Sequence, residues 1–180
     1  MFIGNAMNDA RANIAFIGFR GTGKSTIAAL LGKKLAREIV STDKEIEKNE
    51  EKTIAEIVGA RGWEYFRKIE CEILQDVCTG QNIIIDCGGG IVLQESNRIV
   101  LQRTASKIIW LQADVDIIEK RIGNDKNRIR FTDEKTLREE IIYEISQREK
   151  LYAHIATHTF NTSLMSANES AENILKLIHQ

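Results

Sequence analysis

Short apolar runs alternate along this chain with longer amphipathic segments. The runs are rich in isoleucine and valine, as in Asn82-Ile83-Ile84-Ile85, which is typical of strands covered on both faces. The pattern predicts strands at about 13–18, 38–42, 82–87, 107–111 and 158–162. It predicts helices at about 24–37, 43–50, 53–60, 63–79, 94–104, 114–122, 133–153 and 168–179. This alternation favours an α/β domain with a parallel sheet between helices.

Composition narrows the class of protein. The 180 residues suit one domain, 1–180, and a formal net charge of −1 gives no sign of nucleic-acid binding. The apolar runs are too short to cross a bilayer, and residues 1–12 look like a ragged N-terminus without a signal core. Three cysteines without a C-x-x-C pattern suit a reducing compartment. We therefore expect a cytoplasmic monomer with small-molecule partners, and neither nucleic acid nor membrane.

The segment after the first expected strand carries the most specific motif. It reads Gly18-Phe19-Arg20-Gly21-Thr22-Gly23-Lys24-Ser25 and matches G-x-x-x-x-G-K-[ST] at every fixed position. Its glycines let backbone N–H groups turn toward a phosphate, and the next helix adds its positive dipole end. Lys24 can reach the β- and γ-phosphates, and Ser25 can bind Mg²⁺. The expected nucleotide-binding residues are Gly21, Thr22, Gly23, Lys24, Ser25 and Thr26.

Three further features bear on the reaction. Asp43 follows the second expected strand, where ligands of open α/β sheets bind, although it could also simply cap the next helix. Arg67 either pairs with Glu70 on a helix surface or holds a substrate carboxylate with its planar guanidinium group. Gly88-Gly89-Gly90 follows the third strand and can bring backbone N–H groups close to a ligand.

A polar, turn-rich segment at 123–127 interrupts the alternation. Arg121, Arg128 and Arg130 surround it. The segment is either a solvated loop or a lid that folds arginines over bound phosphates. In a phosphate-binding domain we favour a lid, at about 123–133.

Taken together, these features resemble the shikimate kinase family, from about residue 14 to the C-terminus. In that family the P-loop is followed by Asp-x-Asp at strand two, a Phe-Arg helix segment and a glycine triplet after strand three. A lid with Arg-Pro-Leu-Leu and a later arginine ahead of a tyrosine complete the pattern. The matching residues are Asp43, Phe66-Arg67, Gly88-Gly89-Gly90, Arg128 and Arg148.

The resemblance implies a three-layer α/β/α P-loop kinase fold with five parallel strands in the order 2-3-1-4-5. It implies phosphorylation of the 3-hydroxyl of shikimate, with ATP and Mg²⁺, in aromatic amino-acid biosynthesis. An acidic polyol needs arginines for its charge and a carboxylate for its attacking oxygen. The implied residues are Asp43, Arg67, Gly88, Gly89, Gly90 and Arg148 for the substrate, Lys24, Asp43 and Arg128 for catalysis, and Arg121 and Arg128 for the nucleotide.

Two departures from the family bear on this implication. Ser41 stands where the family has the first Asp of Asp-x-Asp, which helps hold hydrated Mg²⁺. Asp86, at the end of the third strand, either replaces that carboxylate or only caps the glycine turn. The lid segment reads Asn127-Arg128-Ile129-Arg130-Phe131 without proline, which predicts a more mobile lid and weaker commitment of bound substrate.

Three other functions are compatible with a P-loop. A kinase for another acceptor, such as a nucleotide or gluconate, remains an alternative, although the Arg67 and Arg148 pair favours a carboxylate-bearing acceptor. A nucleotide-binding relative that has lost catalysis is a second, with Ser41 as the lesion. A regulatory GTPase is disfavoured, because no Asn-Lys-x-Asp occurs to select guanine.

Overall fold

The computed structural model describes residues 13–123 and 135–178. Within them the strands are β1 (Asn13–Ile17), β2 (Ile39–Ser41), β3 (Ile84–Asp86), β4 (Ala105–Gln112) and β5 (His158–Asn161). The helices are α1 (Lys24–Leu35), α2 (Thr42–Glu50), α3 (Ile54–Val77), α4 (Glu95–Thr104), α5 (Val115–Ile122), α6 (Leu137–Ile155) and α7 (Ala167–Ile178), with a 3-10 turn η2 at Ile91–Leu93. The expected lid, with Arg128 and Arg130, lies outside these residues apart from Gly123, as does the N-terminal 1–12.

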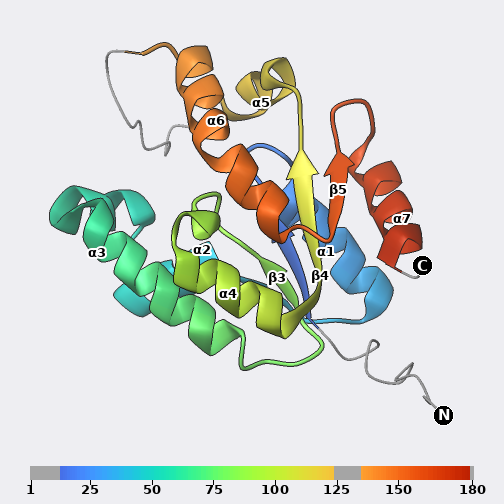
Figure 1. Ribbon diagram of the computed structural model, residues 1–180, viewed down its shortest axis with the longest axis horizontal. Helices are drawn as coiled ribbons and strands as arrows, with labels where there is room; N and C mark the ends of the chain where they lie inside the picture. Colours follow the sequence, from blue (N-terminus) through green and yellow to red (C-terminus); the bar gives the residue numbers. More distant parts are fainter. Residues whose placement is uncertain (1–12, 124–134, 179–180) are drawn as a thin grey trace.

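The strands form a parallel sheet in the order β2-β3-β1-β4-β5 (Figure 1), which confirms the expected fold. Parallel neighbours need crossover connections, and helices supply them here. Because β1 is central, the residues that follow β1, β2 and β3 meet at one edge of the sheet. The candidate binding and catalytic residues that follow these strands therefore lie close together.

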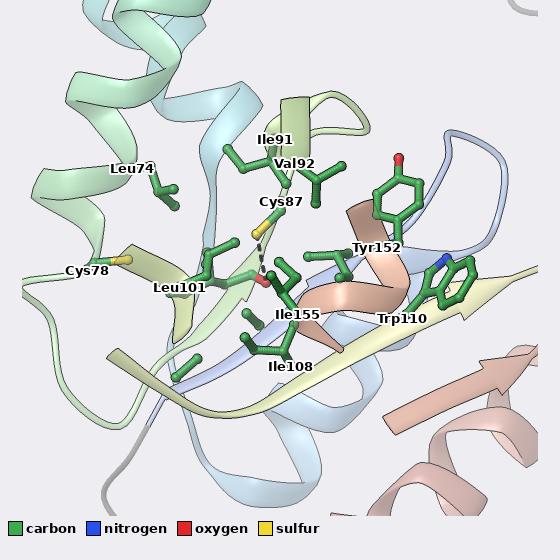
Figure 2. Close-up of a cluster of buried hydrophobic side chains, with 14 of the residues drawn as sticks. Leu74, Cys78, Cys87, Ile91, Val92, Leu101, Ile108, Trp110, Tyr152 and Ile155 are labelled. Carbon is green, nitrogen blue, oxygen red and sulfur yellow. Dashed lines mark hydrogen bonds between the residues drawn. The ribbon is translucent and has the colours of Figure 1, made fainter. Parts of the chain in front are cut away.

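Successive side chains of the central strands point to opposite faces and build two cores. On one face, Ala15 and Ile17 of β1 pack in a cluster with side chains of α3, α4 and α6. Figure 2 shows this cluster, in which Tyr152 stacks on Trp110 with ring centroids 5.7 Å apart. On the other face, Phe16 packs with side chains of α1 and α7. The molecule therefore has three layers, and none of its described helices is long and apolar enough to span a membrane.

Helix α3 consists of two helical segments that meet at Gly62, which confirms the sequence prediction of two helices at 53–60 and 63–79. Gly62 is not helical, and its φ of 79° and ψ of 172° favour glycine. Thr53 and Glu56 close a capping box at its start. The break redirects the chain, and the part of α3 after it carries Phe66 and Arg67.

Smaller differences concern the ends of elements. Strand β4 begins at Ala105 rather than at 107, and α6 begins at Leu137, after the capping residue Thr136, rather than at 133. The turn η2 was not expected from the sequence. These shifts leave every predicted strand in its place.

Candidate active site

The P-loop joins β1 to α1 and is built around positive-φ glycines. Gly18, Gly21 and Gly23 have φ of 135°, 80° and 93°, a region that other residues enter only with strain. The carbonyl of Phe19 is the internal anchor of the loop. It accepts hydrogen bonds from the Thr22 hydroxyl (2.7 Å) and from the Lys24 ammonium (3.0 Å).

A cavity of about 590 Å³ opens over this loop. All six nucleotide-binding residues predicted from the motif line it. Ser25 and Thr26 are exposed to it at the start of α1, whereas Lys24 is buried. The cavity also reaches the ends of β2 and β3, where Ser41 and Asp86 contribute to its wall. Its size and its lining by a helix N-terminus suit a nucleotide polyphosphate.

Arg121 lies at the rim of the same cavity. Its guanidinium group donates to the Gly21 carbonyl (3.0 Å) and to the Thr162 carbonyl (3.2 Å). The side chain thereby links α5 to the P-loop and to the segment after β5. Its predicted position beside the nucleotide stays a prediction, and Arg128 lies outside the described residues.

A second, smaller hollow of about 140 Å³ adjoins the first, beside α3 and α6. Arg67 and Arg148 both line it, so the structure brings together the two arginines expected to bind a carboxylate. Their side chains are 14% and 6% exposed, respectively. Aromatic rings of Trp63 and Phe66 lie within 5.3 Å of the Arg67 guanidinium carbon. The partly apolar wall of the hollow thus carries three guanidinium groups, those of Arg20, Arg67 and Arg148, together with the carboxylates of Asp43 and Glu70.

Each of these arginines is fixed by a carboxylate on its own helix. The Arg67 Nη1 atom donates to both oxygens of Glu70, at 2.8 and 2.7 Å, and Glu70 is only 1% exposed. Arg148 pairs with Glu144 and donates from Nη1 to the Gly89 carbonyl (3.3 Å). The alternative of an Arg67–Glu70 surface pair is therefore wrong in one respect: the pair exists, but inside the hollow.

The glycine triplet fits closely between these groups. A Cβ atom at position 88 would collide with the Asp43 carboxylate, and one at position 90 would collide with the Arg67 guanidinium group. The Gly89 carbonyl accepts a hydrogen bond from the buried Tyr152 hydroxyl. Glycine at 88 and 90 therefore lets the Asp43 and Arg67 side chains reach their positions.

Asp43 stands where the two hollows meet. Only Arg20, Asp43 and Gly89 line both, among the described residues. Asp43 belongs to the first turn of α2, and Ser41 holds the cap position, so the capping alternative for Asp43 is wrong. A carboxylate at this junction borders the P-loop cavity on one side and the hollow with Arg67 and Arg148 on the other.

Burial and charge shape the ionisation of this centre. Burial raises the pKa of Asp43 to about 6, although the nearby Lys24 ammonium opposes the shift. Burial lowers the pKa of Lys24, while Asp86 and Asp43 act in the opposite direction. A carboxyl group whose pKa lies near neutrality is suited to accepting a proton from an attacking hydroxyl.

Sequence reasoning missed Arg20 as a residue of the site. Its position is a variable one within the motif, so only its charge could have drawn attention to it. In the structure it pairs at 2.7 Å with Glu140 of α6, which is 1% exposed. The pair ties the P-loop to the helix that carries Arg148, across 120 residues of sequence.

Comparisons with known proteins agree with this geometry. A family model for shikimate kinase matches residues 20–179. The chain belongs to the shikimate kinase family. A shikimate kinase of Dehalococcoides mccartyi (strain BAV1) is 38% identical over 162 residues, which cover 90% of each chain. One of Pelotomaculum thermopropionicum is 36% identical over 168 residues, covering 93% of this chain and 96% of the relative.

Solved structures of shikimate kinases resemble the whole sheet and its helices. The structure described as shikimate kinase from Acinetobacter baumannii in complex with shikimate has a TM-score of 0.88 and 29% identity, with 93% of each chain covered. The enzyme of Bacteroides thetaiotaomicron has a TM-score of 0.86 and 26% identity, covering 95% of this chain and all of the other. As a shikimate kinase family member, the protein is a phosphotransferase that uses ATP and Mg²⁺.

Proposed function

We propose that this protein transfers the γ-phosphoryl group of ATP to the 3-hydroxyl of shikimate. The observation that carries the proposal is the position of Asp43, on the shared wall of a P-loop cavity and the hollow that contains Arg67 and Arg148. A phosphoryl acceptor must present a hydroxyl to the nucleotide while its remaining charge is held elsewhere. Family membership and the shikimate complex of the Acinetobacter relative support shikimate as that acceptor.

Each group has a distinct task in this proposal. Arg67 and Arg148 hold the acceptor carboxylate, because their paired carboxylates fix both guanidinium groups in the hollow. Asp43 orients the acceptor hydroxyl and takes its proton as the oxygen attacks. The backbone of Gly88-Gly89-Gly90 borders the acceptor.

Charge on the transferred group is met from the nucleotide side. Lys24 gives up its bond to the Phe19 carbonyl and bonds to the phosphates. The P-loop N–H groups also donate hydrogen bonds to the phosphate oxygens. Ser25, exposed at the start of α1, supplies the hydroxyl ligand to Mg²⁺. The ion, when bound, neutralises phosphate charge. Arg128 and Arg121 are proposed to complete the nucleotide site.

We infer that the protein acts in the cytoplasm as a monomer. The P-loop cavity and the adjoining hollow are both formed within a single chain, and its three cysteines are free, which suits a reducing compartment. Size-exclusion chromatography with light scattering tests the monomer. A mass of about twice 20.4 kDa would contradict it.

The acceptor is tested by substrate choice and by conservative substitution. With ATP and Mg²⁺ in a coupled assay, we expect turnover of shikimate and none of gluconate or nucleosides. Arg67→Lys keeps the charge but loses the planar fork, and we expect the KM for shikimate to rise roughly 10–100-fold with the KM for ATP unchanged. Arg61→Lys, on the exposed side of α3, is the matched control. Equal KM values for shikimate in the wild type and Arg67→Lys would contradict the role.

A further inference from the structure

Asp86 is a buried residue whose negative charge the Lys24 ammonium partly offsets. It ends β3, its residue is 6% exposed, and what exposure remains is toward the P-loop cavity. Within the described residues, no hydrogen bond reaches its carboxylate oxygens. A buried carboxylate without hydrogen bonds is costly unless a cation lies beside it.

The adjacent glycine turn is closed without Asp86. The Cys87 N–H donates to the Phe16 carbonyl (3.1 Å), and the Gly88 N–H donates to the Thr42 hydroxyl (2.9 Å). A capping carboxylate binds the N–H two or three residues further on, and the first of these, the Gly88 N–H, is already bonded to Thr42. The structure therefore gives no support to the capping alternative for Asp86.

The placement of Asp86 relates it directly to Ser41. β2 and β3 are adjacent parallel strands, and Ser41 and Asp86 are paired in their register. Strands in a sheet lie about 4.8 Å apart, so exchanging the two side chains moves a carboxylate by roughly that distance. Both residues line the cavity that contains Ser25. The negative charge that position 41 lacks is thus present one strand over.

A cation that arrives with the nucleotide fits this site better than a resident one. No group of three or more His, Cys, Asp or Glu side chains in the described part of the chain could hold a metal ion. Mg²⁺ commonly needs only one or two carboxylates, with substrate phosphates supplying the other charge. The Lys24 ammonium partly offsets the charge of Asp86 in this structure, where it also donates to the Phe19 carbonyl. In the proposed nucleotide complex Lys24 bonds to the phosphates, so a cation beside Asp86 then has to come with the nucleotide.

Resting on the proposed nucleotide site, we infer that Asp86 is the protein carboxylate that holds Mg²⁺ beside Ser25 in the nucleotide complex. Asp86 supplies, from the neighbouring strand, the negative charge beside Mg²⁺ that Ser41, its register partner, lacks. The site is then a relocated cation site rather than an impaired one. Its chemistry is that of a divalent cation shared between one carboxylate, one hydroxyl and phosphate oxygens.

The test measures binding of ADP by calorimetry over a series of Mg²⁺ concentrations, with the acceptor omitted. For Asp86→Asn, which keeps the shape of the side chain, we expect the Mg²⁺ concentration that half-maximally tightens ADP binding to rise roughly 10–100-fold. Binding of ADP in EDTA stays close to wild type. Asp76→Asn, at an exposed position near the end of α3, is the matched control and keeps the wild-type Mg²⁺ response.

The relocation itself is tested by Ser41→Asp/Asp86→Asn. We expect this double variant to recover most of the Mg²⁺ response that Asp86→Asn loses, because the charge returns to the same cavity from the paired strand. An unchanged Mg²⁺ response in Asp86→Asn overturns the inference. Equal weakening of ADP binding in EDTA and in Mg²⁺ also overturns it, because Asp86 then supports the loop or Lys24 and not the ion.

The outcome is independent of the acceptor. If shikimate is not phosphorylated but Asp86→Asn shows the loss, the proposed function fails and the metal site stands. If shikimate is turned over and the Mg²⁺ response of Asp86→Asn equals that of the wild type, the metal inference alone fails.

Discussion

At the scale of single residues, the site holds carboxylates in surroundings that disfavour their charge. Asp43 shows this most clearly, because burial raises its pKa to about 6 while Lys24 only partly offsets the effect. An acid with a raised folded-state pKa destabilises the fold once it ionises. Such a cost is common where activity requires a strained or desolvated group.

This cost predicts how Asp43→Asn changes stability with pH. Below about pH 4 Asp43 is protonated in both states, so the fold carries no penalty. The penalty grows as pH rises toward 6 and then levels off, at up to about 3 kcal/mol. In thermal unfolding of the ligand-free protein, we expect Tm of Asp43→Asn relative to wild type to increase from pH 4 to pH 7. A difference that does not change with pH contradicts this, and Glu45→Gln on the same helix controls for loss of charge.

The sequence predicted which residues form the site better than it predicted the contacts between them. Lys24 could be chosen from the P-loop motif, and Asp43, Arg67 and Arg148 from the resemblance to the family. The structure brings all four to the two adjoining hollows. Spacing could not show that Glu70 would be buried with Arg67, because that depends on how α3 packs. Arg20 was missed because its partner lies far away in sequence.

At the scale of elements, α3 determines where the acceptor arginine stands. The sequence predicted a break near residue 62, and the structure has one at Gly62 within a longer helix. The exact joining of the two parts could not be predicted, because it depends on a positive φ chosen by tertiary packing. The 3-10 turn η2, which comes directly after the glycine triplet in the sequence, could not be predicted either.

Gly62 and Gly59 give a matched pair of substitutions in α3. A Cβ atom would meet nothing within 4 Å at either position, but only Gly62 has a positive φ. We expect Gly62→Ala to destabilise the protein by about 1–2 kcal/mol and Gly59→Ala to stabilise it by up to about 1 kcal/mol. Denaturant unfolding measures both changes. Similar effects for the two variants would show that backbone conformation does not decide the break.

At the scale of the whole molecule, one ion pair links the P-loop to helix α6, between residues 120 positions apart in the sequence. Arg20 of the P-loop bonds to Glu140 of α6, whose side chain is 1% exposed. The Arg20 side chain itself is 29% exposed, so the pair is half buried, and its loss removes a charge-assisted hydrogen bond from the buried Glu140 carboxylate. Arg138, by contrast, pairs with acidic groups at an exposed position, where it is 49% exposed.

This difference predicts unequal effects of two similar substitutions. We expect Arg20→Met to lower the free energy of unfolding by about 2 kcal/mol, and Arg138→Met to lower it by less than about 1 kcal/mol. For a protein of this size the first change lowers Tm by roughly 4–8 °C. Calorimetry of both variants measures the difference. Equal Tm values would mean that the Arg20 pair contributes no more than a surface pair.

The shared wall of Arg20, Asp43 and Gly89 has a consequence for inhibition. The two hollows adjoin at this wall, so one molecule of suitable length can reach into both. A bisubstrate compound, with adenosine joined through a phosphate chain to a cyclic hydroxy acid, gains the effective concentration of a tethered pair. Such compounds are expected to bind more tightly than either half, with the best tether length set by the distance across that wall.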